Sequence, residues 1–199
     1  MERVERTLPD GFSYYYYQCP RCNRVDYPPC EAQKLLEYSK THTFLFLDDW
    51  ILLWLYIGDG APVCGITKLQ KDIFIVTMEF AQKNNIPSEN PGFKAYKFGP
   101  YTERIDRSID TLTKMGLVKS VGRLNTDVER FFLTESGINV AAKLSRSLTQ
   151  EQMKALRELR EDLQQFSAQG EMTYVYAHYP EYTDESVVFE RTLHRRRNR

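Results

Sequence analysis

Residues 96–137 constrain the fold more than any other part of this chain. The stretch opens with Tyr96-Lys97-Phe98-Gly99-Pro100-Tyr101, in which Gly99-Pro100 breaks the chain before a helical pattern over residues 102–115. This helix is predicted to bury a single stripe, because its apolar residues recur three or four positions apart, at Ile105, Ile109 and Leu112. Gly116 suits its C-terminal cap.

Two strands and another helix complete this stretch. Residues 117–121 and 128–133 are predicted to pair around a polar loop at 122–127, and Thr134 to cap the helix that follows. A helix, a strand, a hairpin, a strand and a capped helix, in this order, are what a winged-helix domain needs. The predicted fold class is therefore α/β, mostly α, with a winged helix-turn-helix domain over residues 33–146.

Upstream, two further helices are predicted. The first covers residues 44–57 and includes the most apolar run of the chain. The second begins at Thr67, where Thr67-x-x-Gln70 fits a capping box, and ends at Asn84-Asn85. Residues 93–98 alternate apolar and polar side chains and are predicted to form a short strand.

Two segments of this domain resemble a known family. Thr67-Lys68-Leu69-Gln70-Lys71, followed by Tyr96-Lys97-Phe98-Gly99-Pro100-Tyr101, is similar to the antitoxin-like Panacea-domain group and related uncharacterised bacterial and archaeal proteins. Leu133-Thr134-Glu135-Ser136-Gly137 is common to many winged-helix regulators. The resemblance covers residues 66–144. It implies a winged-helix-like α/β domain with regulatory or partner-binding work, and it carries no catalytic residues.

The two ends of the chain flank this domain. Residues 1–32 are predicted to form a Cys-rich appendage, and residues 147–199 an amphipathic helix, a Tyr-rich segment and a basic tail. Thr149-x-x-Gln152 is a second capping box. The helix that it opens has apolar residues at coiled-coil-like spacing, so it either packs on the domain or forms a homodimer seam over residues 149–166. These residues are Leu156, Leu159, Leu163 and Phe166.

Composition limits the class of function. Lys plus Arg and Asp plus Glu each number 27 among 199 residues, so no global field draws the chain to a polyanion. The longest apolar run is too short to span a bilayer, and the charged start is unlike a signal peptide, so a cytoplasmic protein without membrane contact is expected. An enzymatic role is not expected, since His42, His178 and His194 share no motif with a nucleophile or carboxylate.

The cysteines suggest a metal site. Cys19-Pro20-Arg21-Cys22 is a Cys-x-x-Cys knuckle and Cys30 follows it, so three thiolates are available for a tetrahedral zinc ion. His42 is the nearest candidate for the fourth ligand, and Cys64 the next. Zinc here would be structural, because a small appendage cannot build its own core. Reduced thiols without metal and a redox pair are the alternatives.

DNA contact is the first functional hypothesis, and a protein partner on the same scaffold is the second. A winged helix presents donors from its recognition helix and wing. Residues 93–133 hold eight basic and five acidic side chains, a net charge of +3, but the helix itself has as many acids as bases. Glu103, Asp106 and Asp110 form an acidic stripe that would repel phosphates. The candidate DNA-contacting residues are Lys97, Arg104, Arg107, Ser108, Thr111, Lys114, Arg123 and Arg130, and the arginines of the C-terminal tail would add phosphate contacts.

Overall fold

A computed structural model describes residues 1–183 of the chain except 125 and 127. It is a mixed α/β structure, mostly helical, with two small antiparallel sheets. The strands are β1 (Glu2–Thr7), β2 (Ser13–Gln18), β3 (Val25–Asp26), β4 (Val63–Cys64), β5 (Val118–Val121) and β6 (Arg130–Leu133). The α-helices are α1 (Pro29–Ser39), α2 (Leu47–Tyr56), α3 (Ile66–Ile75), α4 (Ala81–Lys83), α5 (Glu103–Lys114), α6 (Glu135–Leu144), α7 (Gln150–Gln164) and α8 (Ala168–His178). A π-helical turn, η1 (Val76–Phe80), joins α3 to α4, and two 3₁₀ turns, η2 (Ser145–Ser147) and η3 (Pro180–Tyr182), follow α6 and α8.

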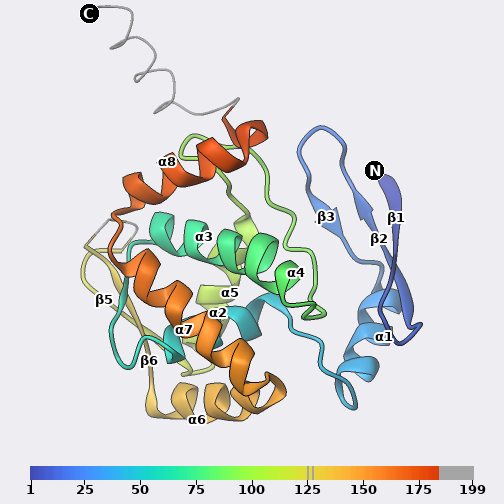
Figure 1. Cartoon of the computed structure of the whole chain (residues 1–199), viewed down its shortest axis with the longest axis horizontal. Coiled ribbons are helices and arrows are strands. Elements are labelled where there is room, and N and C mark those ends of the chain that lie inside the picture. The colour runs from blue at the N-terminus through green and yellow to red at the C-terminus, as the bar shows by residue number, and fades with distance from the viewer. Residues whose placement is uncertain (125, 127, 184–199) are drawn as a thin grey trace, which may run out of the picture.

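The chain divides into an N-terminal appendage, made of β1, β2, β3 and α1, and a helical body that begins at α2. The appendage lies to one side of the body, and β3 and β1 form opposite edges of its sheet (Figure 1). Its hydrophobic cluster is separate from the main core and consists of Tyr14, Tyr16, Val25, Leu35 and Phe44. The appendage therefore has a small core of its own, made largely of aromatic rings, contrary to the premise behind structural zinc.

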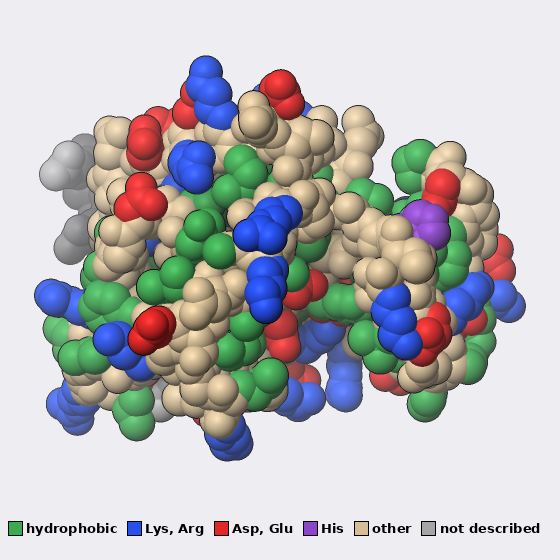
Figure 2. Space-filling model, turned by 90° about the horizontal axis from the view of Figure 1, so that it is seen from below, with side chains coloured by type: hydrophobic (Ala, Val, Ile, Leu, Met, Phe, Trp, Pro, Cys, Tyr) green, Lys and Arg blue, Asp and Glu red, His purple; other side chains and the backbone are tan. Residues whose placement is uncertain are grey.

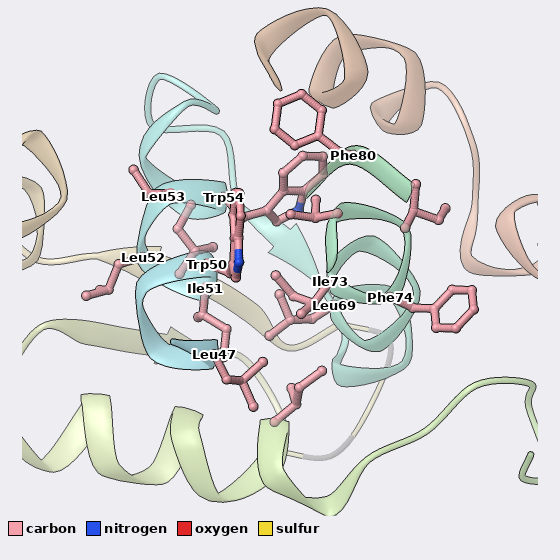
Figure 3. Close-up of a cluster of buried hydrophobic side chains, with 14 of the residues drawn as sticks. Leu47, Trp50, Ile51, Leu52, Leu53, Trp54, Leu69, Ile73, Phe74 and Phe80 are labelled. Carbon is pink, nitrogen blue, oxygen red and sulfur yellow. The ribbon is translucent and has the colours of Figure 1, made fainter. Parts of the chain in front are cut away.

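The core of the body forms where α2 packs against α3 (Figure 3). Trp50 and Trp54 of α2 are fully buried, as are Leu69 and Ile73 of α3. This α2 segment is apolar on all sides, which is typical of a helix surrounded by others. In Figure 1, α8 crosses above α3, while α7 and α6 lie below it. The body is thus a helical core with one small sheet at its side.

That sheet has the strand order β4-β6-β5, and both pairings are antiparallel. The β5–β6 pairing confirms the predicted hairpin, and its register places Val118 opposite Leu133. Thr134 caps α6 as predicted, its Oγ1 accepting a hydrogen bond from the Gly137 N–H at 3.0 Å. The second predicted capping box is also confirmed at Thr149 and Gln152.

Two local predictions were wrong. The helix α3 begins one residue before Thr67, with Gly65 at the N-cap position, so Thr67 and Gln70 form no capping box. Gly65 has a φ of 82°, a left-handed conformation that glycine adopts without strain, and this sets where the helix starts. Residues 93–98 contain no strand; an isolated bridge between Lys94 and Tyr101 closes this loop instead.

Candidate interaction face of α5 and the β5–β6 hairpin

A buried side chain of α3 holds the start of α5. The Gln70 amide donates to the Thr102 carbonyl at 2.9 Å and accepts from the Thr102 N–H at 3.0 Å. Thr102 is the N-cap of α5, and its own hydroxyl donates to the Pro91 carbonyl at 3.0 Å. This clamp fixes the direction of α5 as it leaves the core. The predicted buried stripe is confirmed, because Ile105, Ile109 and Leu112 are all buried.

Arg104 belongs to the interior side of this helix, although the sequence suggested a DNA contact. Its guanidinium pairs with the buried Glu89 carboxylate at 2.8 Å and donates to the Asn90 carbonyl at 3.2 Å. Glu89 also accepts from the Leu47 N–H at the start of α2, at 2.6 Å. Arg104 therefore joins α5 to the loop before it and is not free for a ligand.

The exposed cations of α5 lie beside acids of the same helix. Arg107 pairs with Glu103 at 3.1 Å, and Lys114 with Asp110 at 3.7 Å. Exposed i,i+4 pairs of this kind are weak and open readily, so neither cation is sequestered. Because each cation is matched by an acid, the helix nevertheless has no net charge. The surface seen from below shows the same interspersion of basic and acidic side chains (Figure 2).

The third acid of α5, Asp106, is held in a different way. Its carboxylate accepts a hydrogen bond from the Tyr101 hydroxyl at 2.6 Å. Burial, and then this hydrogen bond, raise the pKa of Tyr101 well above its usual range. Tyr101 therefore stays a neutral donor to the Asp106 carboxylate.

The hairpin presents both apolar and basic side chains to solvent. Val121, Leu124 and Val128 are 55%, 68% and 58% exposed around its tip. Arg123 and Arg130, two predicted DNA-contacting residues, are exposed on the same hairpin, and Lys119 is exposed on β5. A cluster of exposed aliphatic side chains is a feature of contact surfaces with other proteins more than of phosphate-binding surfaces.

Two adjoining hollows run along α5. The first, of about 290 Å³, lies between α5 and the hairpin. Its charged lining is one base, Arg107, against three acids, Asp106, Asp110 and Glu129. The second, of about 200 Å³, is bounded by the aromatic rings of Tyr96, Phe98 and Tyr101, and its charged lining residues are Lys71 and Asp106. The hollows share Ile66 and Asp106, so they form one continuous face.

The remaining predicted DNA-contacting residues are divided over this face. Thr111 is exposed and Ser108 half-buried on α5. Lys97 is exposed in the loop at the second hollow, 5.9 Å from the centre of the Tyr96 ring. The arginines from residue 191 onward, and His194, lie outside the described residues.

The predicted metal ligands are spread over the appendage. Cys19 and Cys22 lie close together on the turn after β2, and hydrogen bonds from the Cys22 thiol and from backbone N–H groups lower the pKa of Cys19. Cys30 instead lies beside Tyr15, and His42 stacks on the Tyr38 ring at 4.4 Å. Within the described part of the chain, no three His, Cys, Asp or Glu side chains meet in a way that could hold a metal ion.

A buried group of charged residues crosses the body and was not predicted. The Asp72 carboxylate accepts from the Trp54 indole at 2.8 Å and pairs with Arg160 at 3.4 Å. Lys68 pairs with both Asp72 and Glu171, and it also donates to the Leu163 carbonyl at 3.0 Å. These contacts join α2, α3, α7 and α8. They are enclosed within the core, so we assign them to stability. The only sequence signal was the i,i+4 spacing of Lys68 and Asp72.

The apolar stripe of α7 packs against the core of the same chain. Leu156 and Leu163 are buried in the main core and Leu159 packs against it, whereas Phe166 is half exposed. This arrangement agrees with the first of the two hypotheses for residues 149–166, namely that the helix packs on the domain. A dimer seam there would have only the outer edge of the stripe.

In comparisons with protein-family models, with curated proteins and with solved structures, no match to this chain was found. Among the described residues, no helix combines the length and the apolar character needed to cross a membrane.

Proposed function

We propose that this chain is a non-enzymatic protein-binding module that uses the face formed by α5 and the β5–β6 hairpin. We further propose that α2, β4, α3, α5 and the hairpin form a winged-helix arrangement. The element order and the pairing of β4 with β6 support this arrangement. The helix of residues 66–83 and the long loop after it, residues 84–102, depart from a compact helix-turn-helix.

One observation carries the functional proposal: the exposed apolar tip of the hairpin adjoins a hollow whose charged lining is mainly acidic. Leu124 is 68% exposed and also lines that hollow. Phosphates would be repelled from a surface containing Asp106 and Asp110. A protein segment with a large apolar side chain and an adjacent Lys or Arg fits both features, since the apolar group covers the tip and the cation meets the acids.

A displayed random-peptide library tests this proposal. We expect the native chain to enrich peptides that combine a large apolar residue with Lys or Arg, and Leu124→Asp to abolish the enrichment. Leu36→Asp is the matched control, because Leu36 is an exposed leucine of the appendage. Enrichment that Leu124→Asp leaves unchanged, or no enrichment above a blank surface, would contradict the proposal.

DNA-binding regulation, the first hypothesis from the sequence, becomes the second candidate, and it is favoured by the exposed cations Lys114, Lys119, Arg123 and Arg130 around the hairpin. Under this candidate, affinity for a random duplex falls steeply with salt, and Arg123→Ala reduces the slope. Arg104→Ala should leave the slope unchanged, because that guanidinium is engaged with Glu89. No duplex binding at low salt would eliminate this candidate and leave the first.

A further inference from the structure

The outer edge of β1 is open. In the sheet order β1-β2-β3, β1 is a terminal strand, at the edge of the sheet opposite β3 (Figure 1). Among the described residues, no strand pairs with this edge. It is a six-residue row of backbone donors and acceptors, and such edges are templates for pairing with another strand.

The ladder within the sheet determines which backbone groups point outward. Leu8 N–H donates to the Phe12 carbonyl at 2.8 Å, so this pair is hydrogen-bonded. Hydrogen-bonded and non-bonded pairs alternate along an antiparallel ladder, so Val4 and Arg6 face β2. The N–H and C=O groups of Arg3, Glu5 and Thr7 therefore point to the open edge. On the other side of β2, Cys19 N–H donates to the Arg24 carbonyl, which gives the same alternation.

The charges of β1 are antisymmetric about Val4, so that positions at equal distance on either side of Val4 carry opposite charges. The strand begins Glu2-Arg3-Val4-Glu5-Arg6. If a second β1 pairs antiparallel with Val4 opposite Val4, then Arg3 lies opposite Glu5 and Glu2 lies opposite Arg6. Every charged position of this five-residue run then meets the opposite charge. Cross-strand pairs of opposite charge stabilise a sheet, and like charges directly opposite destabilise it.

Two neighbouring antiparallel registers also pair the outward N–H and C=O groups of both copies, but they do not bring opposite charges together at every position. Centring the pair on Glu5 places two glutamates opposite each other, and centring it on Arg3 places two arginines opposite each other. In the Val4-centred register, Arg3 and Glu5 of the two copies are the hydrogen-bonded pairs, so backbone and side-chain requirements agree. Charges on an edge strand usually prevent pairing, but here the pattern disfavours the registers centred on Arg3 and Glu5 and favours the register centred on Val4.

We propose that β1 pairs antiparallel with β1 of a second copy of this chain, centred on Val4, so that two three-stranded sheets join into one sheet of six strands. In the single chain, Arg3 and Glu5 pair with each other at 2.7 Å and are 54% and 70% exposed. This pair can therefore be shared with the second copy without breaking a buried contact. The two-fold symmetry is that of an isologous dimer.

Charge reversal provides a sharp test by sedimentation or light scattering of the full chain over a range of concentrations. We expect the native chain to dimerise, and Arg3→Glu and Glu5→Arg each to weaken the homodimer at least tenfold. A mixture of the two variants should restore association, because every cross-strand pair in the heterodimer again has opposite charges. The double variant R3E/E5R should likewise recover the native homodimer.

Control variants separate this edge from other surfaces. Lys154→Glu reverses an exposed charge on α7, and Phe166→Ala removes the exposed aromatic residue after it. Both should leave dimerisation unchanged. A native chain that stays monomeric up to millimolar concentration would overturn the proposal. So would a dimer that is indifferent to the Arg3 and Glu5 reversals, or single variants that their mixture does not rescue.

Discussion

The appendage and the helical body both contain a three-stranded antiparallel sheet, but they are stabilised in different ways. The appendage gathers five buried, mainly aromatic residues from nearby parts of the sequence. The body is crossed by buried polar contacts between residues far apart in the chain: Arg160 pairs with Asp72, 88 positions away, and Lys68 donates to Glu171, 103 positions away. We therefore expect the appendage to open locally, and the loss of one buried charge to affect several helices of the body at once.

The largest effect is expected in the body. Asp72→Ala leaves Arg160 and Lys68 without their shared buried partner, so the free energy of unfolding should fall by about 3–5 kcal/mol. Urea unfolding followed by circular dichroism measures this. Asp162→Ala, on the exposed side of α7, is the control and should change stability by less than about 0.5 kcal/mol. Equal effects of the two variants would refute the role given to the buried group.

A substitution in the core of the appendage should have a smaller and more local effect on stability. Leu35→Ala removes a fully buried side chain of the small cluster and should cost about 2–4 kcal/mol. Its neighbour Leu36 is exposed, so Leu36→Ala is a matched control with little effect. Hydrogen exchange should show lost protection in residues 2–39 while the amides of α2 and α3 stay protected. Loss of protection throughout the chain would show that the two units unfold together.

The buried charged group of the body should make its stability depend on pH. Burial, and then the charge of Asp72, raise the pKa of Glu171 to about 9 from 4.5. Between these values the native state keeps a proton that the unfolded state releases, so stability should fall as pH rises, by at most about 1.4 kcal/mol per pH unit. Above neutrality Lys71 opposes this, because burial lowers its pKa to about 7 and the unfolded state then holds the extra proton.

The measurement for Glu171 is therefore the unfolding free energy between about pH 5 and pH 7. Glu171→Gln should flatten the slope relative to the native chain. This difference isolates Glu171 from Asp49, whose pKa burial raises to about 6. An unchanged slope would mean that Glu171 is ionised in the folded protein as well.

The smallest change in stability is expected at the two predicted capping boxes, where it should distinguish the box that forms from the box that does not. Thr149→Ala removes a side chain that accepts from the Gln152 N–H at 3.1 Å and should cost about 1 kcal/mol. Thr67→Ala should cost less, since Thr67 lies inside α3 and caps nothing. Thermal unfolding of both variants checks this order, and a larger cost at Thr67 would contradict the cap assignment.

Local patterns in the sequence predicted much of the body. The hairpin, the caps at Thr134 and Thr149, and the apolar stripe of α5 depend on residues within a few positions of each other, so the sequence displays them directly. The sequence missed the start of α3 because it could not show that Gln70 is recruited by the Thr102 backbone, 32 positions away. The sequence also could not show that Arg104 is engaged in the interior while Arg107 is exposed, because both are basic residues on one helix.

The amino-acid sequence alone was enough to predict the β5–β6 hairpin, the caps at Thr134 and Thr149 and the buried stripe of α5, and it contains the antisymmetric charge pattern of β1. Which charges remain available for binding depends on the tertiary structure. Arg104 is withdrawn into a pair with Glu89, and Lys68 and Arg160 are buried around Asp72, whereas Arg123 stays exposed at the hairpin. The physical reason is that periodicity fixes the face on which a side chain lies, but its partner comes from another element, and only packing brings the two together.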